Sequence, residues 1–136
     1  MGWIGWALAA FGVMAVANFG MKAASLRGLS PAAVLFGVIL GEAPLALAEW
    51  LRRGRPGFTP GGAAWAIGAG LATGIALICL NEAFARGAKG GLAVGVMNAN
   101  FILVALAGWF FFKESLDPGK LLGLGLTLAG LWLMTR

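Results

Sequence analysis

The chain has 136 residues, of which 60% are hydrophobic and 11% are charged, and its formal net charge is +5. Its mean hydropathy is +0.90, and a soluble core cannot hide so much apolar surface, so the composition predicts an integral membrane protein. The Lys and Arg residues stand at the ends of apolar runs, where they anchor to lipid headgroups, and this placement argues against nucleic-acid binding.

Five apolar segments are long enough to cross a bilayer, which takes about 20 residues of helix, with roughly 17 to 25 tolerated. They cover residues 3–24, 31–51, 62–84, 91–112 and 119–135. The connections between them are short and contain the Gly and Pro residues typical of turns. No basic stretch precedes the first segment, so we expect a retained first helix and not a cleaved signal peptide. The sequence therefore predicts an all-α, multi-pass protein with a single transmembrane domain over residues 1–136.

The basic residues divide evenly between the two faces of the membrane. With five spans, each face receives five of the ten Lys and Arg residues. Orientation follows from the difference in Lys and Arg between the faces, so a difference of zero predicts that the chain inserts both ways round. The alternative is that a local excess, such as the RRGR run at residues 52–55, selects one orientation. The N-terminal face holds Arg52, Arg53, Arg55, Lys113 and Lys120, and the opposite face holds Lys22, Arg27, Arg86, Lys89 and Arg136.

The second segment carries a carboxylate, Glu42, near its middle, and Pro44 follows two residues later. A charge at that depth costs roughly 2.5–3.5 kcal/mol on insertion scales, and a low dielectric favours the protonated form. Two interpretations stay open: a site for a proton or cation, or a permanently protonated carboxyl bonded to a neighbouring helix. Further along the same segment, Glu49 and Arg53 are spaced i, i+4 and are predicted to pair at the interface.

Three asparagines inside the spans also need hydrogen-bond partners, because hydrocarbon supplies none. Asn18 lies in the first span, and Asn98 and Asn100 lie in the fourth. The last two point about 200° from each other on a helix, so we expect only one of them to line a cavity. Each asparagine either lines a substrate path or joins two helices.

Three further polar residues are accessory candidates. Lys22 either extends to the headgroups or pairs with Glu42. Asn81 and Glu82 lie near the end of the third span, and Glu82 with Arg86 has the i, i+4 spacing of an interfacial ion pair. Glycine pairs at i, i+4, such as Gly37 and Gly41, indicate close helix packing in general.

Residue types that carry enzyme chemistry are scarce. The chain has no histidine, and its one cysteine, Cys79, lies inside an apolar run. No nucleophile–base set, phosphate-binding loop or metal-ligand cluster is visible. We therefore expect no enzyme activity, no cofactor and no metal.

Residues 80–134, LNEAFARGAKGGLAVGVMNANFILVALAGWFFFKESLDPGKLLGLGLTLAGLWLM, resemble the EamA domain of the drug/metabolite transporter superfamily. The stretch FKESLDPGKLLGLGLTLAGLWL carries most of the resemblance, with Glu114 at the rim of the fourth helix. The first half is similar through GWALAAFGVMAVANFGMK, whereas the second helix has LGEAP where the family often has an arginine. Four-span members use a glutamate in the first helix for proton and cation, and this chain has none there, so the role of Glu42 is a hypothesis of our own.

The resemblance implies one five-helix inverted-repeat unit of a ten-helix transporter. With the even charge distribution, it implies an antiparallel homodimer in a bacterial or archaeal inner membrane, in contact with lipid. The expected function is export of small organic cations or amphipathic metabolites, coupled to protons. The alternatives are a facilitator of neutral metabolites or amino acids, and a non-transporting subunit of a hetero-oligomeric transporter. Glu42, Asn18, Asn98 and Asn100 would line the substrate and proton site.

Overall fold

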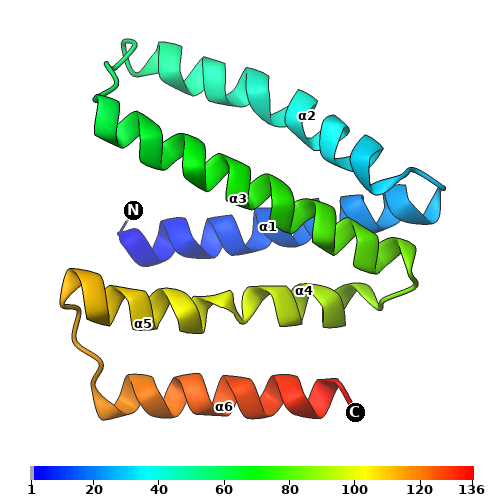
Figure 1. The fold of residues 1–136 in the computed structure, drawn as a ribbon, viewed down its shortest axis with the longest axis vertical. Helices are drawn as coiled ribbons and strands as arrows, with labels where there is room; N and C mark the ends of the chain where they lie inside the picture. Colours follow the sequence, from blue (N-terminus) through cyan, green and yellow to red (C-terminus); the bar gives the residue numbers. More distant parts are fainter. Residues whose placement is uncertain (1) are drawn as a thin grey trace. The chain divides into compact units, whose positions relative to one another are not determined.

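The computed structural model describes residues 2–136, and these residues form six helices and no strand (Figure 1). Four candidate spans are long and apolar enough to cross a membrane, and a shorter apolar helix of 17 residues follows them. The prediction of an all-α membrane protein with five spans is confirmed. The helices are α1 (Trp3–Leu26), α2 (Pro31–Arg52), α3 (Pro60–Ala85), α4 (Gly90–Asn98), α5 (Asn100–Phe112) and α6 (Pro118–Met134).

Three of the helices begin with the same local signal, a capping side chain followed by proline. The cap accepts a hydrogen bond from the backbone N–H three residues later, and proline has no N–H to leave unpaired at the first helical position. The caps are Ser30 on α2 (3.2 Å to Ala33 N), Thr59 on α3 (3.2 Å to Gly62 N) and Asp117 on α6 (2.9 Å to Lys120 N).

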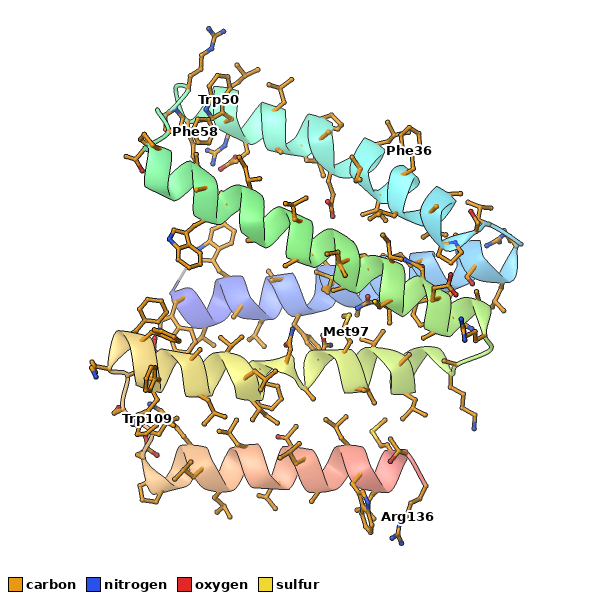
Figure 2. All side chains as sticks on the ribbon, viewed as in Figure 1. Phe36, Trp50, Phe58, Met97, Trp109 and Arg136 are labelled. Atoms are coloured by element: carbon orange, nitrogen blue, oxygen red, sulfur yellow. The ribbon has the colours of Figure 1, made fainter. Side chains whose placement is uncertain are left out.

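The fourth predicted span, residues 91–112, is interrupted in the structure. It divides into α4 and α5 at Ala99, whose N–H is shared between the carbonyls of Gly95 and Val96 at 3.2 Å each. Ala99 O then accepts from Ile102 N at 3.1 Å, three residues on, as in a 3₁₀ turn. Figure 2 labels Met97, just before this break. In contrast, Pro44 lies within a continuous α2.

The first compact unit extends to Gly87 and contains α1, α2 and α3, each in contact with the other two. Few of its apolar residues are buried, and most of its large apolar side chains are exposed. This is expected for helices that face lipid. The turn between α2 and α3 is held by Trp50, whose Nε1 donates to Pro56 O at 3.1 Å (Figure 2). The core consists of Met21, Val34, Leu80 and Phe84.

The second compact unit, Ala88–Arg136, contains α4, α5 and α6. Within it, α6 packs against α4, and Gly95 lies close to Leu131: a Cβ added at Gly95 would be 3.1 Å from Leu131 Cδ2. The absence of a side chain at Gly95 therefore allows this approach. At its C-terminus, the Arg136 guanidinium lies 3.6 Å from the ring centroid of Trp132.

Candidate functional site

The helices of the first unit surround a pocket of about 790 Å³. This volume falls within the range of roughly 300–1,000 Å³ that is usual for small-molecule sites. Residues of α1 and α2 form most of its wall, and α3 contributes Thr73 and Leu77. Among the described residues that line it, Glu42 is the only charged one. The pocket is thus an apolar space with one carboxylate.

The Glu42 carboxylate has no hydrogen-bond or ion-pair partner among residues 2–136, and its side chain is exposed. The other carboxylate of α2 differs: Glu49 accepts from Arg52 Nε at 2.7 Å and from Arg53 Nε at 2.5 Å. The predicted pairing of Glu49 with Arg53 is confirmed, and Arg52 is a second partner that the spacing did not identify. Glu42 therefore remains able to take a proton or a cation.

Lys22 makes its contacts on α3. Its Nζ donates to the backbone oxygen of Phe84 at 3.2 Å and lies 5.3 Å from the centre of the Phe84 ring. Phe84 is almost fully buried. Of the two predicted roles of Lys22, an ion pair with Glu42 is not formed in the structure. This leaves Glu42 without an internal counter-ion from the first unit.

Asn18 and Asn81 are the buried polar side chains of the described chain, 7% and 0% exposed. Asn81 Nδ2 donates to Leu77 O at 2.8 Å and lies 3.8 Å from Met21 Sδ on α1. Asn18 is three residues before Met21, on the same face of that helix. Neither Oδ1 atom has a partner within residues 2–136. A buried acceptor without a donor costs about 1–3 kcal/mol, so a hydrogen-bond donor at either Oδ1 atom would stabilise the folded chain.

The remaining candidates lie elsewhere. Asn98 and Asn100 are exposed and flank the break between α4 and α5, in the second unit. Glu82 lies 3.5 Å from Arg86 Nε, as the i, i+4 spacing predicts. Asn18 is not among the residues that line the pocket. The structure therefore buries Asn18 on α1 and Asn81 on α3, with Asn81 against Met21 of α1, and places Glu42 in the pocket wall.

Sequence reasoning missed that three glycines form part of the pocket wall. A Cβ added at Gly20, Gly37 or Gly41 would meet no other heavy atom within 4 Å, and all three line the pocket. The spacing of Gly37 and Gly41 indicated close helix packing, but within the first unit these positions border open space. The signal in the sequence was Gly41 and Gly37, one and five residues before Glu42.

All residues of the chain, 1–136, match the EamA-like transporter family. A stretch of 46 residues is 39% identical to a protein of Pseudomonas savastanoi pv. phaseolicola named as a probable 4-amino-4-deoxy-L-arabinose-phosphoundecaprenol flippase subunit, ArnE. That alignment covers 34% of this chain and 40% of the relative, so it spans well under half of either. No solved structure matches the chain.

Proposed function

Because the chain belongs to the EamA-like transporter family, we propose that it exports small organic cations or amphipathic metabolites across a bacterial or archaeal inner membrane in exchange for protons. The observation that carries this proposal is Glu42, a carboxylate without a partner among the described residues in the wall of an apolar pocket. Unpaired carboxylates inside membrane spans are costly and usually serve a proton or ion pathway.

The proposed cycle uses competition at this carboxylate. A proton occupies the Glu42 carboxylate until a cation enters the pocket and displaces it. The cation then stabilises the charged carboxylate, and the proton leaves towards the side from which the cation came. Release of the cation on the other side is followed by reprotonation. Proton and cation therefore never occupy Glu42 together, and this exclusion couples their fluxes.

The proposed working form is an antiparallel homodimer. The even division of Lys and Arg residues between the two faces favours insertion in both orientations. Transporters built from inverted repeats bind substrate near the midplane, where the repeats meet. In such a dimer, Asn18, Asn98 and Asn100 are proposed to line the path, with Lys22, Asn81 and Glu82 as accessory groups.

Ethidium efflux from proteoliposomes with an imposed pH gradient tests the coupling. We expect wild-type protein to drive efflux only when the gradient is present, and Glu42→Gln to abolish this dependence. Glu49→Gln is the matched control, because Glu49 lies on the same helix but pairs with Arg52 and Arg53 outside the pocket. Gradient-driven efflux by Glu42→Gln at the wild-type rate would contradict the mechanism. Flux insensitive to the gradient in the wild type would favour a facilitator of neutral metabolites.

A second candidate function follows from the name of the relative, which is described as a flippase subunit. By analogy, this chain could work as one subunit of a hetero-oligomeric transporter. Purification from its native membrane under mild detergent separates the two cases. A second, different membrane protein in stoichiometric amount, together with no flux by the chain alone, would favour the subunit role over the homodimer.

A further inference from the structure

The pocket of the first unit is elongated along the helix axes. Its lining residues on α1 extend from Ala10 to Ala24 and those on α2 from Ala33 to Leu45, and Leu29 lies in the turn between the two helices. At 1.5 Å per residue, each wall runs about 20 Å, two thirds of the roughly 30 Å hydrocarbon layer. Because a short turn joins α1 to α2, Ala24 and Leu29 lie at the same end. We call this space the α1–α2 groove.

The charge in the groove is placed towards one end. Glu42 is three positions from Leu45 but nine from Ala33, so about 14 Å of the α2 wall lies on its far side, and the turn with Leu29 follows. That long part has small residues on both helices, and its glycines, Gly20 and Gly37, border open space. The groove thus combines a carboxylate towards one end with a long apolar wall.

A second copy of the chain does not supply the missing charge. Among the described residues, every Lys and Arg lies near a helix end or in a turn, and none lies at the depth of Glu42. Lys22, the one nearest to a span interior, already donates to Phe84 O. A helix of another copy could cover the groove but would leave the Glu42 carboxylate unpaired, which is costly in a low dielectric.

We propose that the α1–α2 groove binds a single-chain amphiphile with a cationic head, its ammonium group against Glu42 and its chain extended towards Leu29. This inference rests on the proposed function, because it names the substrate class of the same site. Lipid tails are as apolar as the groove, so the chain gains little by leaving the bilayer. The ammonium–carboxylate contact therefore makes the groove bind this ligand in preference to a neutral lipid chain. The shape of the groove sets the position of the alkyl chain.

Photo-crosslinking with dodecylamine tests this arrangement. Two probes are used in phosphatidylcholine vesicles, one with a diazirine on the last carbon and one with a diazirine beside the amine. We expect the terminal probe to label the stretch from Ala24 to Ala33, and the head probe to label the stretch around Glu42 and Leu45. Neutral dodecanol with the same diazirines should label both stretches roughly tenfold less, because it lacks the charge-assisted hydrogen bond.

Variants in the groove, and one outside it, test the head contact and the chain contact separately. Glu42→Gln should reduce labelling by the amine probes to the level of dodecanol. Gly37→Leu should prevent terminal labelling, because its side chain would fill open space in the groove, and Gly41→Leu serves if that variant does not fold. Gly68→Leu is the matched control: its added side chain also meets open space, but on α3 and outside the groove.

The outcomes separate this inference from the proposed function. Equal labelling by amine and alcohol, or amine labelling spread evenly over the lipid-facing helices, would overturn the groove assignment. If that occurs while ethidium efflux still depends on Glu42, the proposed function stands and only the ligand class is wrong. If the groove is labelled as expected but no variant changes efflux, the proton-coupled exchange fails and the binding site remains.

Discussion

Glu42 and Glu49 are the same side chain on the same helix, and their surroundings give them different chemistry. Glu49 stands near the end of α2 beside two guanidinium groups, and such exposed pairs contribute little to stability. Glu42 faces an apolar pocket and has no partner among the described residues. The sequence predicted the Glu49–Arg53 pair and the position of Glu42 near the middle of its span, since both are local properties, but it did not predict the pocket beside Glu42.

Other residue-level contacts could not be predicted, because they depend on which helices pack together. The acceptor of Lys22 is a carbonyl 62 residues away on α3. Asn81 was expected near the end of its span, but the structure makes it the most buried polar side chain of the described chain. Neither fact has a local sequence signal, because helix periodicity says which face a residue shares but not what covers that face.

At this scale we predict the effect of Asn81→Leu. Leucine has as many side-chain heavy atoms as asparagine and removes an acceptor, Asn81 Oδ1, that has no partner among the described residues. We therefore expect the free energy of unfolding to stay within about 1 kcal/mol of wild type. Titration with sodium dodecyl sulfate, followed by tryptophan fluorescence, measures it. A loss of about 3 kcal/mol or more would mean that Asn81 makes a buried polar contact beyond those in this structure.

Among the helices, the break between α4 and α5 is the feature that the sequence did not predict. The run from residue 91 to 112 is apolar without proline, so it was expected to be one helix. Irregular backbone at membrane depth is tolerated only against protein or a water-filled cavity, and broken helices mark the binding sites of many transporters. This is the physical reason to keep Asn98 and Asn100, which flank Ala99, as proposed site residues.

The packing of α6 on α4 gives a prediction for Gly95. A larger side chain there meets Leu131, whose Cδ2 would be 3.1 Å from an added Cβ. We expect Gly95→Leu to lower the free energy of unfolding by about 1–3 kcal/mol, as overpacking does. Leu131→Ala in the same chain should restore part of the loss by making room. Gly125→Leu on α6, where an added Cβ meets nothing within 4 Å, is the control, and an equal loss there would contradict the argument.

The start of α6 gives a prediction about pH. The Lys120 N–H donates to Asp117 and holds the pKa of that carboxyl below its ordinary value of 3.8. Since the folded pKa is the lower one, the stabilisation is complete above the ordinary value and is lost as pH falls through the folded value. Amide hydrogen exchange at Lys120 and Leu121 should accelerate only below about pH 4, relative to the intrinsic rate. Asp117→Asn caps the helix without titrating and should remove this acceleration of exchange at low pH. If the acceleration persists in Asp117→Asn, Asp117 is not the group that titrates.

For the whole molecule, the helical spans could be predicted from the sequence. The thickness of the bilayer sets the length of each apolar helix, so the long apolar runs can be counted. The sequence also predicts the orientation of the chain, and this prediction is open to direct measurement. Single cysteines at each terminus, on a Cys79→Ala background, should react with a membrane-impermeant maleimide from both sides of the membrane in roughly equal parts, since the charge bias is zero. Reaction of each terminus from one side alone would show a single orientation and remove the basis for an antiparallel dimer.

The central claim is that a cation and a proton compete for Glu42, and proton release on binding tests it most directly. Purified protein in weakly buffered detergent is mixed with dodecylamine hydrochloride or ethidium, and the pH is followed against a protein-free blank. We predict that the wild type and Glu49→Gln release protons on binding and that Glu42→Gln releases none. Undiminished release by Glu42→Gln would contradict the account.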